Sequence, residues 1–114
     1  MIDALERARA AAGTVIPSAI NFYREMDHCY AVMMKVNDTD YHEDNKAALH
    51  TDTIQVDIWQ RDKRPFAESQ AVRIALVGAG FEPRSGGDES SEQANGKTWH
   101  RISRDFDFTQ EVDE

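Results

Sequence analysis

The chain has 114 residues, of which 40% are hydrophobic and 30% are charged, a composition typical of one soluble globular domain. It carries 13 Lys and Arg against 21 Asp and Glu, a formal net charge of −8 at pH 7. This excess of negative charge argues against a nucleic-acid-binding protein and against an anionic membrane surface as partner, because Lys and Arg supply most of the affinity for both.

The cysteine and the N-terminal residues indicate where such a chain would reside. With Cys29 as its single cysteine, the chain has no internal disulfide, which favours a reducing compartment. The first seven residues lack the basic-then-apolar order of a signal peptide, and no apolar run is long enough to span a bilayer. We therefore expect neither export nor membrane insertion.

The first third of the chain predicts one helix and two strands. Residues 2–12 are rich in alanine at helical spacing, and Gly13 is placed to end the helix. Ser18 to Arg24 predicts a short edge strand, and Cys29 to Val36 predicts a longer one. Because both faces of the longer strand are apolar, we expect it to lie inside the sheet or to be covered at an oligomer contact. Its faces carry Tyr30, Val32, Met34 and Val36 on one side and Ala31 and Met33 on the other.

The next segment predicts a turn and then the clearest strand. The run Asn37-Asp38-Thr39-Asp40 consists of turn-forming residues, and the polar residues that follow, 42–45, predict a surface loop. From Thr51 to Gln60 apolar and polar residues alternate, which predicts a strand with one face in the core. The expected core face carries Ile54, Val56 and Ile58, and the opposite face carries Gln55, Asp57 and Trp59.

The last third predicts a helix and a closing strand. Pro65 suits the first turn of a helix, which we expect to end at Gly78 and Gly80. We assign its apolar stripe to Ala67, Ala71, Ile74 and Ala75, flanked by Val72 and Leu76. Residues 85–96 predict a flexible hairpin loop, and residues 109–114 an acidic tail. The closing strand, Lys97 to Phe108, would place Ile102, Phe106 and Phe108 inward.

Together these elements predict one α+β domain over residues 1–114, in the order α-β-β-β-α-β-β. We expect a small antiparallel or mixed sheet packed with two helices.

The chemistry-bearing residues show no pattern typical of a metal or catalytic site. His28 and Cys29 are adjacent, so a strand would point them to opposite faces, and the His42–His50 stretch has no zinc spacing. Asp38-Thr39-Asp40 begins like a calcium loop, but Glu43 stands where that loop requires glycine. No serine or cysteine lies in a nucleophile motif. We expect no metal, no cofactor and no enzymatic activity.

Two tryptophans lie on the polar sides of their strands, Trp59 beside Asp57 and Trp99 opposite Ile102. Two explanations remain open: loops or a second layer cover both rings, or the rings belong to a protein interface, where tryptophan is enriched. The candidate residues for such an interface with another subunit or a partner are Trp59, Asp57, Met33, Trp99 and Tyr41.

The series of segments over residues 30–108 resembles the small tail-completion proteins of long-tailed phages and prophages, also called tail-terminator or head–tail joining proteins. Four features carry the resemblance: the polar loop ending in Asp44-Asn45-Lys46, the strand Ile54-Gln55-Val56-Asp57-Ile58-Trp59 with a charged step into the following helix, Gly80-Phe81, and the closing Phe106-Asp107-Phe108.

The resemblance implies a structural subunit with no cofactor and no catalysis. Such subunits form a homo-oligomeric ring, usually hexameric, that caps the tail-tube protein and joins it to the head-connector protein. Double-stranded DNA would pass through the ring without specific binding, and there would be no membrane partner. The expected location is the head–tail junction of the virion, and the host cytoplasm during assembly.

Three alternatives to a tail terminator remain. A head-closure or adaptor protein of the phage neck would share the virion setting. An acidic regulatory protein that mimics DNA belongs to another class and needs its carboxylates in a regular stripe, whereas here they gather in the predicted loops and tail. A small enzyme would need a polar cluster converging in a deep pocket.

Overall fold

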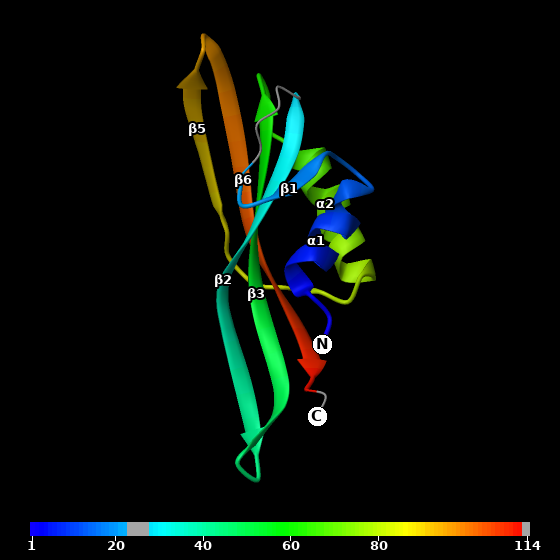
Figure 1. Ribbon diagram of the computed structural model, residues 1–114. Coiled ribbons are helices and arrows are strands. Elements are labelled where there is room, and N and C mark those ends of the chain that lie inside the picture. The colour runs from blue at the N-terminus through cyan, green and yellow to red at the C-terminus, as the bar shows by residue number, and fades with distance from the viewer. Residues whose placement is uncertain (23–27, 113–114) are drawn as a thin grey trace.

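Two helices lie against one side of a six-stranded mixed sheet in the computed structural model, which describes residues 1–22 and 28–112 (Figure 1). The helices are α1 (Ala4–Gly13) and α2 (Phe66–Gly78). The strands are β1 (Ser18–Ile20), β2 (Cys29–Glu43), β3 (Lys46–Arg61), β4 (Glu82–Pro83), β5 (Asp88–Ala94) and β6 (Lys97–Glu111).

The sheet has the order β1-β2-β3-β6-β4, and β5 pairs with β6 beside β4. The short β1 runs parallel to β2, and the other pairs are antiparallel. The predicted α+β class and element order are confirmed, with the two-residue β4 as an addition.

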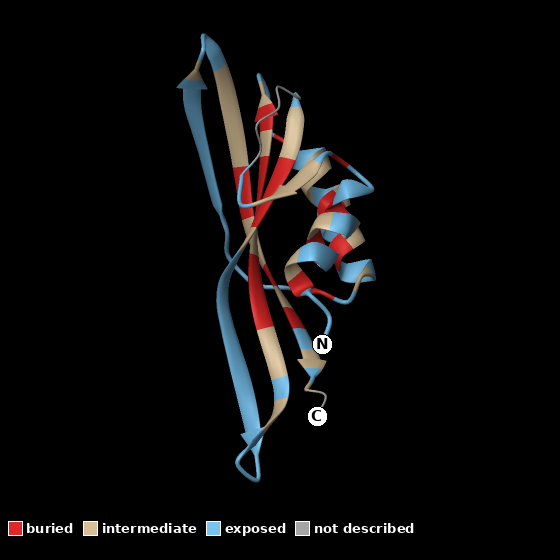
Figure 2. Cartoon of the chain, in the orientation of Figure 1, coloured by how far each residue is buried: buried red, intermediate tan, exposed pale blue. Residues whose placement is uncertain are grey.

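The core lies between the helices and the face of the sheet that carries Ile54, Val56 and Ile58, as the alternation in β3 predicts. The buried residues of helix α1 are all alanines, Ala4, Ala8 and Ala12, and the partly buried Leu5 packs beside them against the core. Asp3 caps this helix, its Oδ1 accepting a hydrogen bond from the backbone N–H of Glu6 at 3.2 Å. Buried residues concentrate where the strands lie beside the helices (Figure 2).

Strand β2 directs Met33 into the core, whereas an interface role would require this side chain to be exposed. Its register pairs Ala31 with Ile58 and Met33 with Val56, so these side chains point into the core, and Met33 is 0% exposed. The predicted interface role of Met33 is therefore wrong. Because both sides of this strand are apolar, only the pairing with β3 decides which side the helices cover.

The turn expected at Asn37-Asp38-Thr39-Asp40 is also wrong, since β2 continues to Glu43 after a bulge between Lys35 and Asn37. The chain reverses at Asp44 and Asn45, which have φ of 53° and 63°. Positive φ at both central residues is the pattern of a type I′ hairpin turn, and Asp and Asn tolerate it. Pairing with β3 supplies hydrogen bonds that override the turn preference of the polar residues.

Two further segments are more regular than expected. The predicted flexible loop, residues 85–96, contains strand β5, which pairs with β6 through a turn at Asn95 and Gly96 with φ of 53° and 74°. The predicted acidic tail begins as part of β6, which pairs with β3 as far as Glu111, and residues 113–114 lie outside the described residues. Of the expected strand Ser18 to Arg24, residues 18–20 form β1, and residues 23–24 are also outside the described part.

Helix α2 buries the two residues that flank the predicted stripe, while Ala67 and Ile74 of the stripe itself are exposed. Val72 and Leu76, one turn apart, are buried in the core, whereas Ile74 is 64% exposed. The assignment of Ile74 to the core stripe is wrong because it lies about 200° around the helix from each of these two residues.

The molecule is elongated, with extents of 57 × 23 × 22 Å. The far ends of β2 and β3 form an arm, residues 37–51, that projects beyond the helices, and its β2 side is exposed (Figures 1 and 2). Among the described residues, no helix is long and apolar enough to cross a membrane.

Candidate functional site

The face of the sheet opposite the helices has no second layer among the described residues (Figure 1). We call it the open face. Three half-buried aromatic side chains lie on it, Tyr30 from β2, Trp59 from β3 and Trp99 from β6. The rings of Tyr30 and Trp99 meet edge to face with centroids 5.7 Å apart. Burial and the negative charge of Glu92 raise the pKa of Tyr30, so its hydroxyl stays protonated near neutral pH.

An acid–arginine pair lies beside these rings. Asp57 is only 7% exposed, and its carboxylate lies 3.6 Å from Nη1 of Arg101 and accepts a 3.0 Å hydrogen bond from Nε2 of Gln55. The Arg101 guanidinium stands 6.0 Å from the centre of the Trp59 ring. The register places Arg101 beside Trp59, because the two residues are directly opposite each other on β6 and β3.

Arg101 also fixes the edge strand. Its Nη2 donates to Asp88 at 2.7 Å and its Nε donates to Ser90 at 2.9 Å, so one side chain connects β3, β6 and β5. The open face therefore combines an apolar surface with compensated charge. Among the residues that the structure describes, this face shows no paired nucleophile and base.

The structure brings together three of the five predicted interface residues, Trp59, Asp57 and Trp99. Tyr41 is on the same side of the sheet and 63% exposed, but it lies on the arm, opposite Leu49 and ten residues along β3 from Trp59. That spacing corresponds to about 33 Å. Arg101 was missed by the sequence analysis. Its position one residue before the inward-facing Ile102 was the signal that it shares a face with Trp99.

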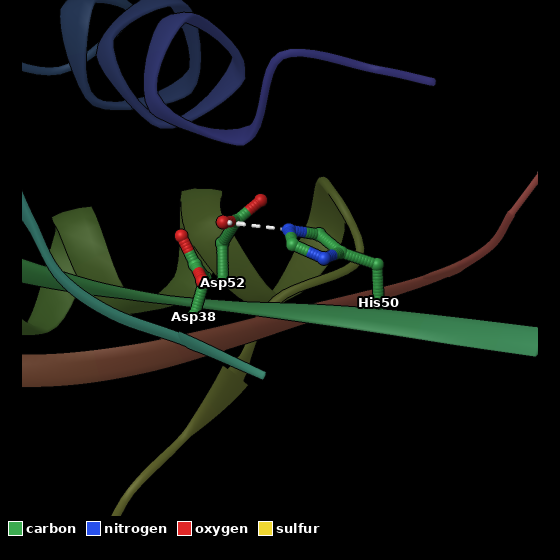
Figure 3. A group of neighbouring side chains, drawn as sticks. All are labelled: Asp38, His50 and Asp52. Atoms are coloured by element: carbon green, nitrogen blue, oxygen red, sulfur yellow. Dashed lines mark hydrogen bonds and ion pairs between the residues drawn. The ribbon is translucent and has the colours of Figure 1, made fainter. Parts of the chain in front are cut away.

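A second polar cluster lies on the helix side, at the base of the arm. Asp38, His50 and Asp52 have ligand atoms within 4.8 Å of one another (Figure 3). His50 Nε2 is 3.0 Å from Asp52, and its Nδ1 is 2.6 Å from Asp40. The antiparallel register assembles this group by pairing Asp38 with Asp52 and Asp40 with His50. No sequence spacing could reveal it, because the residues belong to two strands.

Two cations within the protein, Lys35 and protonated His50, compensate much of the negative charge of this cluster. Hydrogen bonds to Asp40 and Asp52 raise the pKa of His50 and favour its protonated ring. Lys35 Nζ lies 3.5 Å from Asp38 and 3.6 Å from Asp52. A divalent cation would have to displace the Lys35 ammonium and the His50 proton, because a metal ligand must be neutral imidazole. The arrangement is better suited to clamping the two strands of the arm at its base.

The environment of Cys29 does not activate its thiol as a nucleophile. Burial, and to a smaller extent the charge of Glu68, raise the pKa of Cys29 to about 11, so the reactive thiolate is scarce at neutral pH. Cys29 packs against the core instead.

No family model and no curated protein matches the chain. Among solved structures, one chain of undescribed function aligns over 96% of this chain and 92% of its own length, with 15% sequence identity and a TM-score of 0.45. Similarity at this level carries no argument about what the protein does.

Proposed function

We propose that this protein is a virion structural subunit of a long-tailed phage or prophage, a tail terminator that assembles into a ring at the head–tail junction. In this role it caps the tail tube and joins it to the head connector. It uses no cofactor and performs no catalysis.

The observation that carries this proposal is the open face of the sheet. A free monomer would leave Trp59, Trp99 and Tyr30 partly in water beside a nearly buried ion pair, which is the composition of an interface centre: aromatic anchors with an arginine. The resemblance of residues 30–108 to tail-completion proteins supports a role for that interface between the subunits of a ring at the head–tail junction.

The charge of the chain supports a ring through which DNA passes. A net charge of −8 disfavours attachment to phosphates, which would hold the duplex in the channel. The elongated shape supports contacts with more than one neighbour, because the arm and the open face lie far apart on the molecule.

Assembly is tested by size-exclusion chromatography with light scattering and by electron microscopy of the purified protein. We expect rings with a central channel from the natural chain, and weakened assembly from Trp59→Ala, because the substitution removes an aromatic anchor of the interface. Circular dichroism should show that the variant keeps its fold, since the Trp59 ring is only half-buried.

Phe66→Ala is the matched control, because it removes an exposed aromatic ring from α2 on the other side of the sheet. It should assemble like the natural chain. A natural chain that stays monomeric at high concentration, also with the tail-tube protein present, contradicts the proposal. If Trp59→Ala unfolds the monomer, Trp59 belongs to the core and the open face is not the interface.

A further inference from the structure

A pocket of about 320 Å³ on the helix side of the sheet is lined by three arginines, although the chain as a whole is acidic. Arg73 reaches it from α2, Arg84 from the segment after β4, and Arg104 from β6. Asp105 is the one acidic residue in the lining, and Pro83 and Phe106 add apolar surface. We call this site the arginine pocket.

Among the described residues, two of the three arginines have no carboxylate partner. Arg84 pairs with Asp107 at 3.2 Å, but Arg73 and Arg104 form no ion pair within the described part of the chain. Arg104 Nη1 donates instead to the carbonyl of Ser103 at 2.9 Å. The loop beside it depends on Gly87, whose φ is 144° and whose added Cβ would lie 2.7 Å from that carbonyl. The pocket thus offers uncompensated guanidinium groups to an anionic partner.

The tip of the arm carries two carboxylates, of opposite sign to the pocket, beside one cation, Lys46, which is opposite Glu43 in the register. Glu43 and Asp44 are exposed there, and neither forms an ion pair with a described residue. The other arm acids are occupied at the base, where Asp40 bonds to His50 and Asp38 lies near Lys35. The unpaired carboxylates of the arm are therefore concentrated at its end.

The tip cannot reach the pocket of its own chain. Arg104 is level with Val56 in the β3–β6 register, ten residues along β3 from Lys46 at the tip. A strand rises about 3.3 Å per residue, which places the tip about 33 Å away. A paired hairpin cannot fold back over that distance without losing its hydrogen bonds.

We propose that Glu43 and Asp44 at the arm tip of one copy of this chain dock in the arginine pocket of the next copy. The contact is head-to-tail, because tip and pocket are different surfaces, and repetition of such a contact closes a ring when the rotation between copies permits. This inference rests on the ring assembly proposed above and names one of the contacts that hold it together.

Charge reversal tests the contact. Arg73→Glu and Glu43→Lys should each weaken assembly by about tenfold or more, because each opposes like charges across the interface. The double variant should assemble within about threefold of the natural chain, because the pair is restored with the signs exchanged. Dissociation constants come from sedimentation equilibrium.

Mixing the two single variants adds a test that folding defects cannot imitate. In an equimolar mixture, the unaltered tip of one variant meets the unaltered pocket of the other, and the reversed tip meets the reversed pocket. Alternating rings should therefore form where neither variant assembles alone. Lys97→Glu, an equal charge reversal at the β5–β6 turn, is the matched control and should assemble normally.

The two proposals fail in different ways. If the natural chain forms rings and the single variants do so equally well, the arm–pocket contact is overturned and the ring remains. If the natural chain is monomeric, both are overturned. Weak single variants without rescue in the double variant or the mixture also overturn the contact. The contact is also overturned if the natural chain binds duplex DNA in a salt-sensitive way and Arg73→Glu abolishes this binding without changing assembly. The pocket would then be a phosphate site.

Discussion

At the scale of single residues, the protein compensates charge where its strands pair. Asp57 is matched by Arg101 on the open face, and Asp52 by His50 and Lys35 on the helix side. Both aspartates are buried on β3, where a carboxylate without a partner would be costly. The Asp57–Arg101 and Lys35–Asp52 pairs join neighbouring strands and so favour the native register, whereas His50 and Asp52 both lie on β3.

Stability should depend on pH through His50. Its pKa is raised in the fold by hydrogen bonds to Asp40 and Asp52, so its contribution is complete below the unfolded value of about 6.5 and is lost as pH rises through the higher folded value. Urea unfolding of the natural chain and of His50→Gln should therefore differ most near pH 6 and least in alkaline buffer.

His42→Gln is the control for this measurement, because His42 lies exposed near the arm tip and forms no ion pair with a described residue. It should follow the pH dependence of the natural chain. Parallel stability curves for the natural chain and His50→Gln would mean that the His50 cluster contributes no pH-dependent stability.

At the scale of the elements, α2 shows how packing selects one stripe from an apolar helix. Phe66, Ile74 and Val77 are exposed, whereas Val72 and Leu76 are buried against the sheet. The helix is apolar on several sides, so its sequence is compatible with more than one buried stripe. The position of α1 beside it, and the sheet beneath, decide which one is covered.

Alanine substitutions distinguish these stripes. Leu76→Ala should reduce the free energy of unfolding by about 2–5 kcal/mol, because it leaves a cavity in the core. Ile74→Ala, which removes an exposed side chain, should change it by no more than about 0.5 kcal/mol. Chemical denaturation of the two variants measures both changes in the free energy of unfolding. An equal loss for both variants would mean that Ile74 is a core residue.

At the scale of the whole molecule, the features proposed for assembly are spread along its length. The open face lies on one side of the sheet, the arginine pocket on the other, and the arm tip at one end. A chain with distinct and distant contact surfaces is suited to head-to-tail assembly, in which every copy gives and receives the same contact.

Thermal stability should then depend on protein concentration. Assembly stabilises the folded state by mass action, so the melting temperature of the natural chain should rise as its concentration increases. Trp59→Ala should melt at a temperature that is independent of concentration over the same range. A natural chain with a constant melting temperature would show that assembly contributes nothing to its stability.

Several features could be predicted from the sequence because they depend on local alternation. The period of two in Ile54, Val56 and Ile58 identifies the core face of β3 and, by the same rule, places Asp57 and Trp59 on the opposite side. The dipeptide Asn95-Gly96, typical of a two-residue hairpin turn, was a local signal that β5 and β6 pair, although the polar composition of residues 85–96 favoured a loop.

The sequence by itself determined the class, the order of the elements and the core face of β3. Tertiary structure alone decided which face of β2 is buried, since both are apolar and only the register with β3 directs Met33 inward. It also decided that residues 37–51 form an arm, and it assembled the His50 cluster and the arginine pocket. These depend on pairing between distant segments, where hydrogen bonding and packing outweigh the local preference of each residue.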